Sequence, residues 1–135
     1  MSYTFTKEER LCSKRLIDSL FHNGSSFVLY PYRVVFIKAE EPSSSVPVQC
    51  IISVPKRRFK RAVDRNMLKR RMRESYRLQK HTLYSFLQQH MLSLTVAFQY
   101  VGKEKTAYAQ LHQRMELVLG KLKDECTKIY LGEDD

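Results

Sequence analysis

The sequence predicts an α+β sandwich with a central sheet, in which helices and strands follow the order α-β-β-β-α-β-α. The length of 135 residues suits one domain of average size. Hydrophobic residues make up 43% of the chain, and Gly and Pro contribute only four each, which is typical of a folded protein with a real core. Apolar residues recur at helical spacing in some segments and in strand-like runs in others. We therefore expect residues 1–135 to form a single domain.

The first helix is predicted over residues 13–22. Its apolar face consists of Leu16, Ile17, Leu20 and Phe21. Ser13 is a suitable N-cap for this helix, and Asn23-Gly24 is a stop signal. Residues 6–9 also have the form of a capping box and offer a competing helix start. We favour the later start and expect residues 1–9 to be a flexible lead-in.

Four strand-like runs follow the first helix, at residues 26–30, 33–39, 48–54 and 91–99. They are rich in β-branched and aromatic residues. Pro31 interrupts the first run, which indicates a short or edge strand. A loop of polar turn formers separates the second run from the third. We therefore expect the second and third strands to pair as a hairpin.

A long amphipathic helix is predicted near the C-terminal end. Its apolar stripe consists of Leu111, Met115, Val118, Leu122, Cys126 and Ile129. These residues are spaced three or four apart, which places them on one side of a helix. Residues 131–135 form an acidic tail that we expect to be flexible.

Positive charge is concentrated directly after the third strand. Residues 56–77 contain eleven Lys or Arg and two acids, so they carry nine of the ten net positive charges. Such a segment indicates a polyanionic partner, because each cation that neutralises a phosphate releases a condensed counterion. A solvated helix without a partner would usually carry acids four residues from its cations. The distribution therefore favours a nucleic-acid-binding protein.

These charges fall on one face of a helix predicted over residues 61–80. At about 100° per residue, one side collects five cations and an amide: Arg65, Asn66, Lys69, Arg70, Arg73 and Arg77. The opposite side, expected to pack on the sheet, consists of Met67, Leu68, Met72, Ser75 and Leu78. Arg71 falls among these apolar positions, so its charge must reach an edge or a partner. A polyanion would relieve the repulsion along the cationic side.

Composition argues against several other classes of protein. No run approaches the roughly 20 apolar residues of a membrane span. The first ten residues lack an apolar signal core, so we expect a cytoplasmic protein with no membrane partner. Three distant Cys and four His show no metal-ligand spacing and no disulfide framework. Because we find no catalytic grouping of side chains and no P-loop, we assign no catalytic residue, no metal site and no small-molecule substrate.

Residues 65–74, RNMLKRRMRE, resemble the Arg-Asn-x-x-Lys-Arg-x-x-Arg-Glu signature of the bacterial ribonuclease P protein family. The resemblance covers roughly residues 9–125. It includes Ala62-Val63, Arg10-Leu11, Leu20-Phe21-x-x-Gly24 and Ser53-Val54-x-Lys56-Arg57. Lys60 stands where the family usually has Gly, and Phe59 looks like an added residue. The resemblance implies a fold with an unusual left-handed β-α-β crossover, formed by the basic helix.

The resemblance also implies a function as the protein subunit of an endoribonuclease. In that family the RNA subunit cuts the 5′ leader from precursor tRNA, with Mg²⁺ bound mainly by the RNA and the substrate. By position, the residues implied to bind the catalytic RNA are Arg65, Asn66, Lys69, Arg70, Arg73 and Arg77. Those implied to form a leader-binding cleft are Ile17, Phe21 and Phe36, flanked by Lys56, Arg57 and Arg58.

Alternatives to this function remain open on the residues alone. A structural RNA-binding protein, such as a ribosomal or assembly factor, shares the basic helix but needs no cleft. A DNA-binding regulator needs a helix-turn-helix partner, whereas a strand precedes the basic helix here. An interaction module for acidic proteins predicts weak RNA binding. For Ile17, Phe21 and Phe36, packing in the core is the alternative to a place in the cleft.

Overall fold

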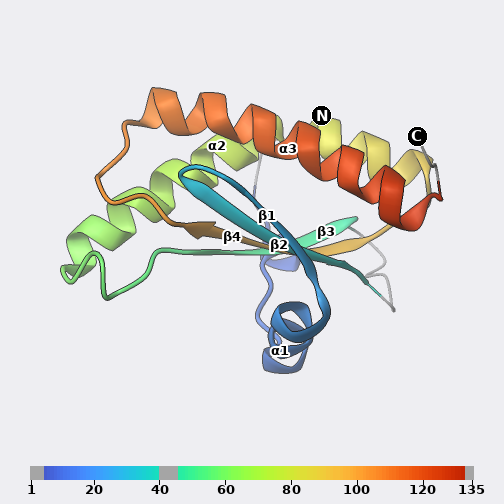
Figure 1. The fold of residues 1–135 in the computed structure, drawn as a ribbon, viewed down its shortest axis with the longest axis horizontal. Coiled ribbons are helices and arrows are strands. Elements are labelled where there is room, and N and C mark those ends of the chain that lie inside the picture. Colours follow the sequence, from blue (N-terminus) through green and yellow to red (C-terminus); the bar gives the residue numbers. More distant parts are fainter. Residues whose placement is uncertain (1–4, 40–45, 133–135) are drawn as a thin grey trace.

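The computed structural model describes residues 5–39 and 46–132 of the chain. Its elements are the short 3₁₀ turn η1 (Lys7–Glu9) and then α1 (Lys14–Asn23), β1 (Ser25–Leu29), β2 (Tyr32–Lys38), β3 (Val48–Ser53), α2 (Ala62–Gln89), β4 (Leu94–Tyr100) and α3 (Tyr108–Tyr130). This order confirms the predicted α+β class (Figure 1). Residues 40–45 of the loop predicted over 40–46 and residues 133–135 of the tail predicted over 131–135 lie outside the described residues.

The four strands form one sheet in the order β1-β2-β4-β3. β4 pairs antiparallel with β2 and parallel with β3. The predicted hairpin between the second and third strands is therefore wrong, because β4 lies between them. β4 is buried at six of its seven positions, as a central strand should be. Strand periodicity in a sequence identifies strands but not their partners, and here α2 carries the chain back so that β4 enters the middle of the sheet.

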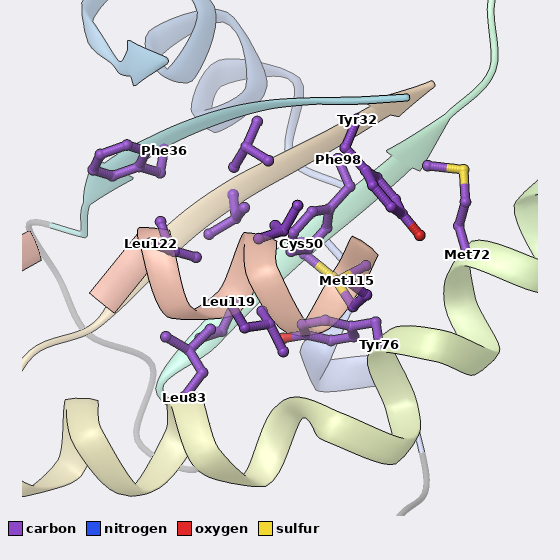
Figure 2. Packing of buried hydrophobic residues seen from close by; sticks show 14 of the residues in the cluster. Tyr32, Phe36, Cys50, Met72, Tyr76, Leu83, Phe98, Met115, Leu119 and Leu122 are labelled. Carbon is purple, nitrogen blue, oxygen red and sulfur yellow. The ribbon is translucent and has the colours of Figure 1, made fainter. Parts of the chain in front are cut away.

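The helices divide between the two faces of the sheet. α2 and α3 cover one face, and α1 crosses the other (Figure 1). Side chains from the sheet, α2 and α3 form the main core, which includes Tyr76, Phe98 and Met115 (Figure 2). A smaller apolar cluster on the α1 face consists of Leu11, Leu20, Val35 and Ala97. β2 serves both faces because its side chains alternate in direction.

α1 begins and ends close to its predicted bounds. The Ser13 hydroxyl accepts a hydrogen bond from the Leu16 N–H at 3.3 Å, as expected of an N-cap. Gly24 ends the helix against the sheet, where a Cβ atom would lie 2.4 Å from the Leu20 carbonyl oxygen and 2.9 Å from that of Phe36. Only glycine fits this close approach, so Gly24 fixes the distance between α1 and β2.

α2 continues nine residues beyond its predicted end at Lys80. The helix ends at Gln89, and two residues beyond it Met91 takes a left-handed backbone conformation with φ of 57°. The Leu92 N–H donates to the Leu87 carbonyl at 2.8 Å, and the Met91 N–H donates to the Gln88 carbonyl at 3.2 Å. These two bonds form a Schellman motif. Because the left-handed residue is Met rather than Gly or Asn, the sequence carries no recognisable stop signal.

The stripe predicted for the C-terminal helix is buried over most of its length. Leu111, Met115, Val118, Leu122 and Cys126 are fully buried. Ile129 is 46% exposed, so its predicted place in the stripe is wrong. Tyr130 takes that place, because its ring meets Phe36 edge-on at 6.5 Å between ring centres.

The described part of the lead-in packs against α2 and β3. Phe5 contacts the Tyr76 ring edge-on at 6.1 Å. Glu9 is 2% exposed and forms an ion pair with Lys80 of α2. The Leu11 N–H donates to the carbonyl of Cys50 in β3 at 2.9 Å, which extends the sheet edge by one bridge.

None of the helices in residues 5–39 and 46–132 has the length and apolar character needed to span a membrane.

Candidate nucleic-acid interface

The cationic side of α2 is open to solvent along the first half of the helix. Asn66, Arg70 and Arg73 are exposed, and Lys69 is half-buried. Among the described residues, none of the three cations in this group forms an ion pair with an acid. Leu68, Met72 and Ser75 on the opposite side are fully buried, which confirms the predicted orientation of the helix. A rigid scaffold therefore holds three uncompensated cations and one amide on a single surface.

Arg65 belongs to the same side but is already engaged within the protein. Its Nη1 donates to the carbonyl oxygens of Phe59 at 2.7 Å and Lys60 at 2.8 Å. These carbonyls end the turn that carries Lys56, Arg57 and Arg58, so Arg65 ties this turn to the start of α2. The structure gives Arg65 a positioning role that the sequence did not indicate.

Arg77, the last cation predicted for this face, is paired with Glu74. Its Nε donates to the Glu74 carboxylate at 3.0 Å. The hydrogen bond from Arg77 lowers the pKa of Glu74, which keeps the carboxylate ionised. The positive charge of Arg77 is therefore partly neutralised before any ligand arrives, unlike that of Arg70 or Arg73.

The N-terminal segment limits the length of the cationic face. By the same helical arithmetic, Tyr76 and Lys80 continue the direction of Arg65 and Lys69. Both residues are nevertheless buried: Tyr76 packs in the main core against Phe98 and is flanked by Phe5, and Lys80 pairs with Glu9. The open cationic surface therefore occupies only the first half of α2.

The turn after β3 adds three exposed cations at the same end of the molecule. Lys56, Arg57 and Arg58 are exposed, and Arg58 Nη1 donates to the Val101 carbonyl at 3.3 Å. Phe59, which looked like an added residue, is 7% exposed and packs against Tyr100 at 5.7 Å between ring centres. The additional aromatic residue thus anchors the turn in the core, in the region where Gly was expected at the helix entry.

Arg71, the cation predicted among the apolar positions of the basic helix, has a hydrogen-bond partner inside the protein. Its Nη1 donates to the Thr106 carbonyl at 2.8 Å, and the neighbouring Lys105 pairs with Asp64 at 2.9 Å. Both contacts join the start of α2 to the loop between β4 and α3. Arg71 therefore has a partner inside the protein and is not part of the open cationic surface.

α1 presents two of the predicted cleft residues beside the sheet. Ile17 is half-buried against the smaller cluster, and Phe21 is 43% exposed. An exposed aromatic ring on a helix that crosses a sheet can stack on an unpaired base. The Ile17 side chain is therefore partly covered by core packing, whereas much of the Phe21 ring is exposed to solvent.

The prediction that Phe36 lines the cleft is wrong. Phe36 is fully buried in the main core (Figure 2). Its ring contacts those of Phe27 and Tyr130. In β2 the side chains that point toward α1 are those of Arg33, Val35 and Ile37, because directions alternate along a strand. The sequence alone left the register of this strand open, and the register places Phe36 on the α3 side.

A cavity of about 180 Å³ lies on the other flank of α1. Its lining includes Arg15, Leu16, Ser19, Ile37, Gln49 and Thr95. It contains none of the residues predicted to contact a leader. α1 therefore separates this cavity from Ile17 and Phe21.

Comparison with known proteins shows that this chain matches one protein family. A family model described as Ribonuclease P matches residues 5–123. The ribonuclease P protein component of Porphyromonas gingivalis is 37% identical over 115 residues, covering 85% of this chain and 83% of the relative. That of Acinetobacter baylyi is 30% identical over 126 residues, covering 93% and 88%.

Two solved structures share the fold. The RNase P protein of Staphylococcus aureus superposes with a TM-score of 0.66 at 21% identity, covering 85% of this chain and 95% of that one. The RNase P protein from Thermotoga maritima gives a TM-score of 0.65 at 21% identity, covering 84% and 96%.

Proposed function

The chain belongs to the ribonuclease P protein family, and from this premise we propose that it assists an RNA-catalysed cleavage by binding RNA on two surfaces. A ribonuclease P protein component is a subunit of the tRNA-processing endoribonuclease. We assign the removal of the 5′ leader from precursor tRNA to the catalytic RNA, working in the cytoplasm. This chain binds that RNA and holds the leader.

The first surface is the open cationic side of α2, which binds the catalytic RNA. The observation that carries this assignment is the group of Lys69, Arg70 and Arg73, which project from one rigid helix without an acidic partner in the described structure. Arg and Lys bind phosphates independently of base identity, and the adjacent Asn66 amide can donate to and accept from a base or a ribose. Arg65 supports this surface by holding the basic turn, and Arg77 contributes at its edge.

The second surface binds the single-stranded leader. Phe21 offers an exposed ring for stacking, which is worth about 1–3 kcal/mol per base, and Ile17 lies one turn before it. Lys56, Arg57 and Arg58 supply phosphate contacts at the end of β3. Phe36 is left out because its side chain is enclosed by the core.

Chemistry is assigned to the RNA, with Mg²⁺ bound mainly by the RNA and its substrate. The protein's contribution to catalysis is then positioning. It neutralises phosphates and orients the leader so that less Mg²⁺ is needed for the same rate.

Leader removal from a precursor tRNA by a bacterial ribonuclease P RNA at low Mg²⁺ tests the proposal. We expect faster cleavage with the protein than with RNA alone, and none with protein alone. Arg73→Gln should weaken binding to the RNA and lower the slope of log affinity against log salt by about 1. Arg114→Gln, which removes an exposed cation from α3, is the matched control and should change neither quantity.

Tight RNA binding without faster cleavage would contradict the proposal and favour a structural RNA-binding protein. Equal effects of Arg73→Gln and Arg114→Gln would contradict the assignment of the α2 surface while leaving the family function intact.

A further inference from the structure

The strand register arranges the α1 face of the sheet in three rows of side chains that run across the strands. The middle row consists of Ser26, Val35, Ala97 and Ile51. α1 lies over this row, because its Leu20 packs in one cluster with Val35 and Ala97. The sheet therefore has a row on each flank of α1.

One flanking row faces the cavity and the other does not. The row of Ile37, Thr95 and Gln49 lines the cavity together with Ser19 of α1. The remaining row, which we name the Arg33 row, consists of Val28, Arg33, Gln99 and Ser53. Side chains two positions apart on a helix point about 160° away from each other. Phe21 therefore lies on the flank of α1 opposite Ser19. Phe21 and the Arg33 row are therefore on the same side of α1.

Arg33 is the one cation in this row, and a neutral side chain holds it. Its Nη1 donates to Gln99 Oε1 at 2.6 Å. The side chain is half-buried, and among the described residues it forms no ion pair with an acid. A partly desolvated cation loses hydration, and an amide oxygen returns only part of that energy. An anion at this position would supply the missing charge.

The surroundings of the row indicate which anion fits. Val28 is 57% exposed next to Arg33, and Phe21 is 43% exposed on the helix above. Past Ser53, β3 leads into the turn of Lys56, Arg57 and Arg58. The row thus lies between an aromatic ring and a basic turn. Unpaired RNA matches this pattern, because it alternates planar bases with phosphates.

We propose that Arg33, oriented by Gln99, binds a backbone phosphate of the leader while Phe21 stacks on a nearby base. This inference rests on the proposed function. The planar guanidinium can bind a phosphate through two parallel hydrogen bonds, and Gln99 restricts its rotation without neutralising its charge. Because the contact is to the backbone, it carries no preference for a particular base.

The test measures the affinity of the assembled protein–RNA complex for precursor tRNA with its leader and for the same tRNA without it, across a salt series. Arg33→Gln should weaken binding of the leader-bearing form about tenfold and leave the leaderless form unchanged. For the leader-bearing tRNA, Arg33→Gln should also lower the slope of log affinity against log salt by about 0.7, the value for one phosphate on a single strand. Arg33→Lys should keep the slope, because it keeps the charge.

Two further variants separate positioning from charge. Gln99→Leu should reduce leader affinity while preserving the salt slope, because the cation remains but loses its orientation. Arg114→Gln on α3 is the matched control for the loss of a surface Arg. Exchanging the leader bases should leave the effect of Arg33→Gln unaltered. All measurements are made well below the melting temperatures of the variants, so that a loss of stability cannot imitate a loss of contact.

The outcomes distinguish this inference from the function on which it rests. If Phe21→Ala weakens leader binding but Arg33→Gln changes neither affinity nor slope, the Arg33 assignment is wrong and the leader surface stands. If Arg33→Gln weakens leaderless tRNA equally, Arg33 does not contact the leader. If neither variant affects leader binding, the leader surface itself is wrong.

Discussion

Glu9 shows how one side chain can decide the position of a whole segment. Its carboxylate accepts hydrogen bonds from the Thr6 N–H at 2.8 Å, from Lys80 and from Tyr84. Burial raises the pKa of Glu9, but these three donors outweigh burial and bring the pKa below its usual value. The ionised carboxylate therefore anchors residues 5–9 to α2. Without that anchor, Tyr76 and Lys80 would lose their cover.

Replacing Glu9 with Gln should lower the free energy of unfolding by about 3 kcal/mol at neutral pH, because it leaves a buried ammonium without its counter-charge. A lowered folded-state pKa means that the stabilisation is complete above the unfolded-state pKa and lost as pH falls through the folded-state pKa. The difference between parent and Glu9→Gln should therefore shrink below about pH 4. Denaturant unfolding at a series of pH values measures both effects.

The exposed neighbour provides the control for this experiment. Glu8→Gln should change stability by less than about 0.5 kcal/mol. The double variant Glu9→Leu with Lys80→Met should recover much of the loss, since it removes both buried charges. A double variant as unstable as the sum of the single variants would show that the ion pair is not the cause.

Arg65 and Arg73 illustrate that residues of one signature can have different physical tasks. Both lie on the cationic side of α2, yet Arg65 binds two backbone carbonyls and Arg73 is open to solvent. Their positions in the sequence pattern do not distinguish them. The difference arises from the turn at residues 55–60, which folds back over the start of the helix.

At the scale of elements, the two halves of α2 differ in what their side chains contact. Its first half exposes cations on one side, and its second half buries Tyr76, Leu83 and Leu87 in the core. The change follows from what covers each half: one side of the first half is open to solvent, whereas the second half is covered by the sheet and α3, with Phe5 and Glu9 over Tyr76 and Lys80. Core contacts of the second half hold the helix rigid against the repulsion among the cations of the first.

The end of α2 offers a direct test of how this helix is terminated. Met91 is 92% exposed and has φ of 57°, so its side chain contributes little packing while its backbone is strained. Met91→Gly should raise the free energy of unfolding by about 1 kcal/mol, because glycine adopts this conformation without steric cost. Thermal or denaturant unfolding would measure the gain. Met91→Ala is the control and should give no gain, since alanine keeps the Cβ atom.

At the scale of the whole molecule, two cysteines report on the integrity of both layers. Cys50 lies in β3 and Cys126 in α3, and both are buried. Burial raises the pKa of each thiol to about 12, so the reactive thiolate is scarce at neutral pH. Cys12 is exposed next to α1.

We therefore expect a thiol reagent to modify Cys12 rapidly in the folded protein and the other two cysteines only when the protein unfolds. Peptide mapping after timed labelling, with and without denaturant, measures this difference. Rapid modification of Cys126 in the folded state would show that α3 separates from the sheet without global unfolding.

The sequence by itself determined the element order, the cationic side of α2 and most of the apolar stripe of α3. These features depend on periodicity and local charge, which are written in neighbouring residues. The signature at residues 65–74 likewise identified the family without reference to contacts. The spacing of four residues also places Ile17 and Phe21 on the same side of one helix.

The tertiary structure alone decided which strands pair, which way β2 faces and which cations are already engaged. β4 separates β2 from β3, Phe36 belongs to the core, and Arg65 binds backbone carbonyls. Arg33 gained its proposed role only when the register placed it beside Gln99 and on the same flank as Phe21. Each of these outcomes depends on contacts between residues far apart in the chain, and no local pattern encodes such contacts.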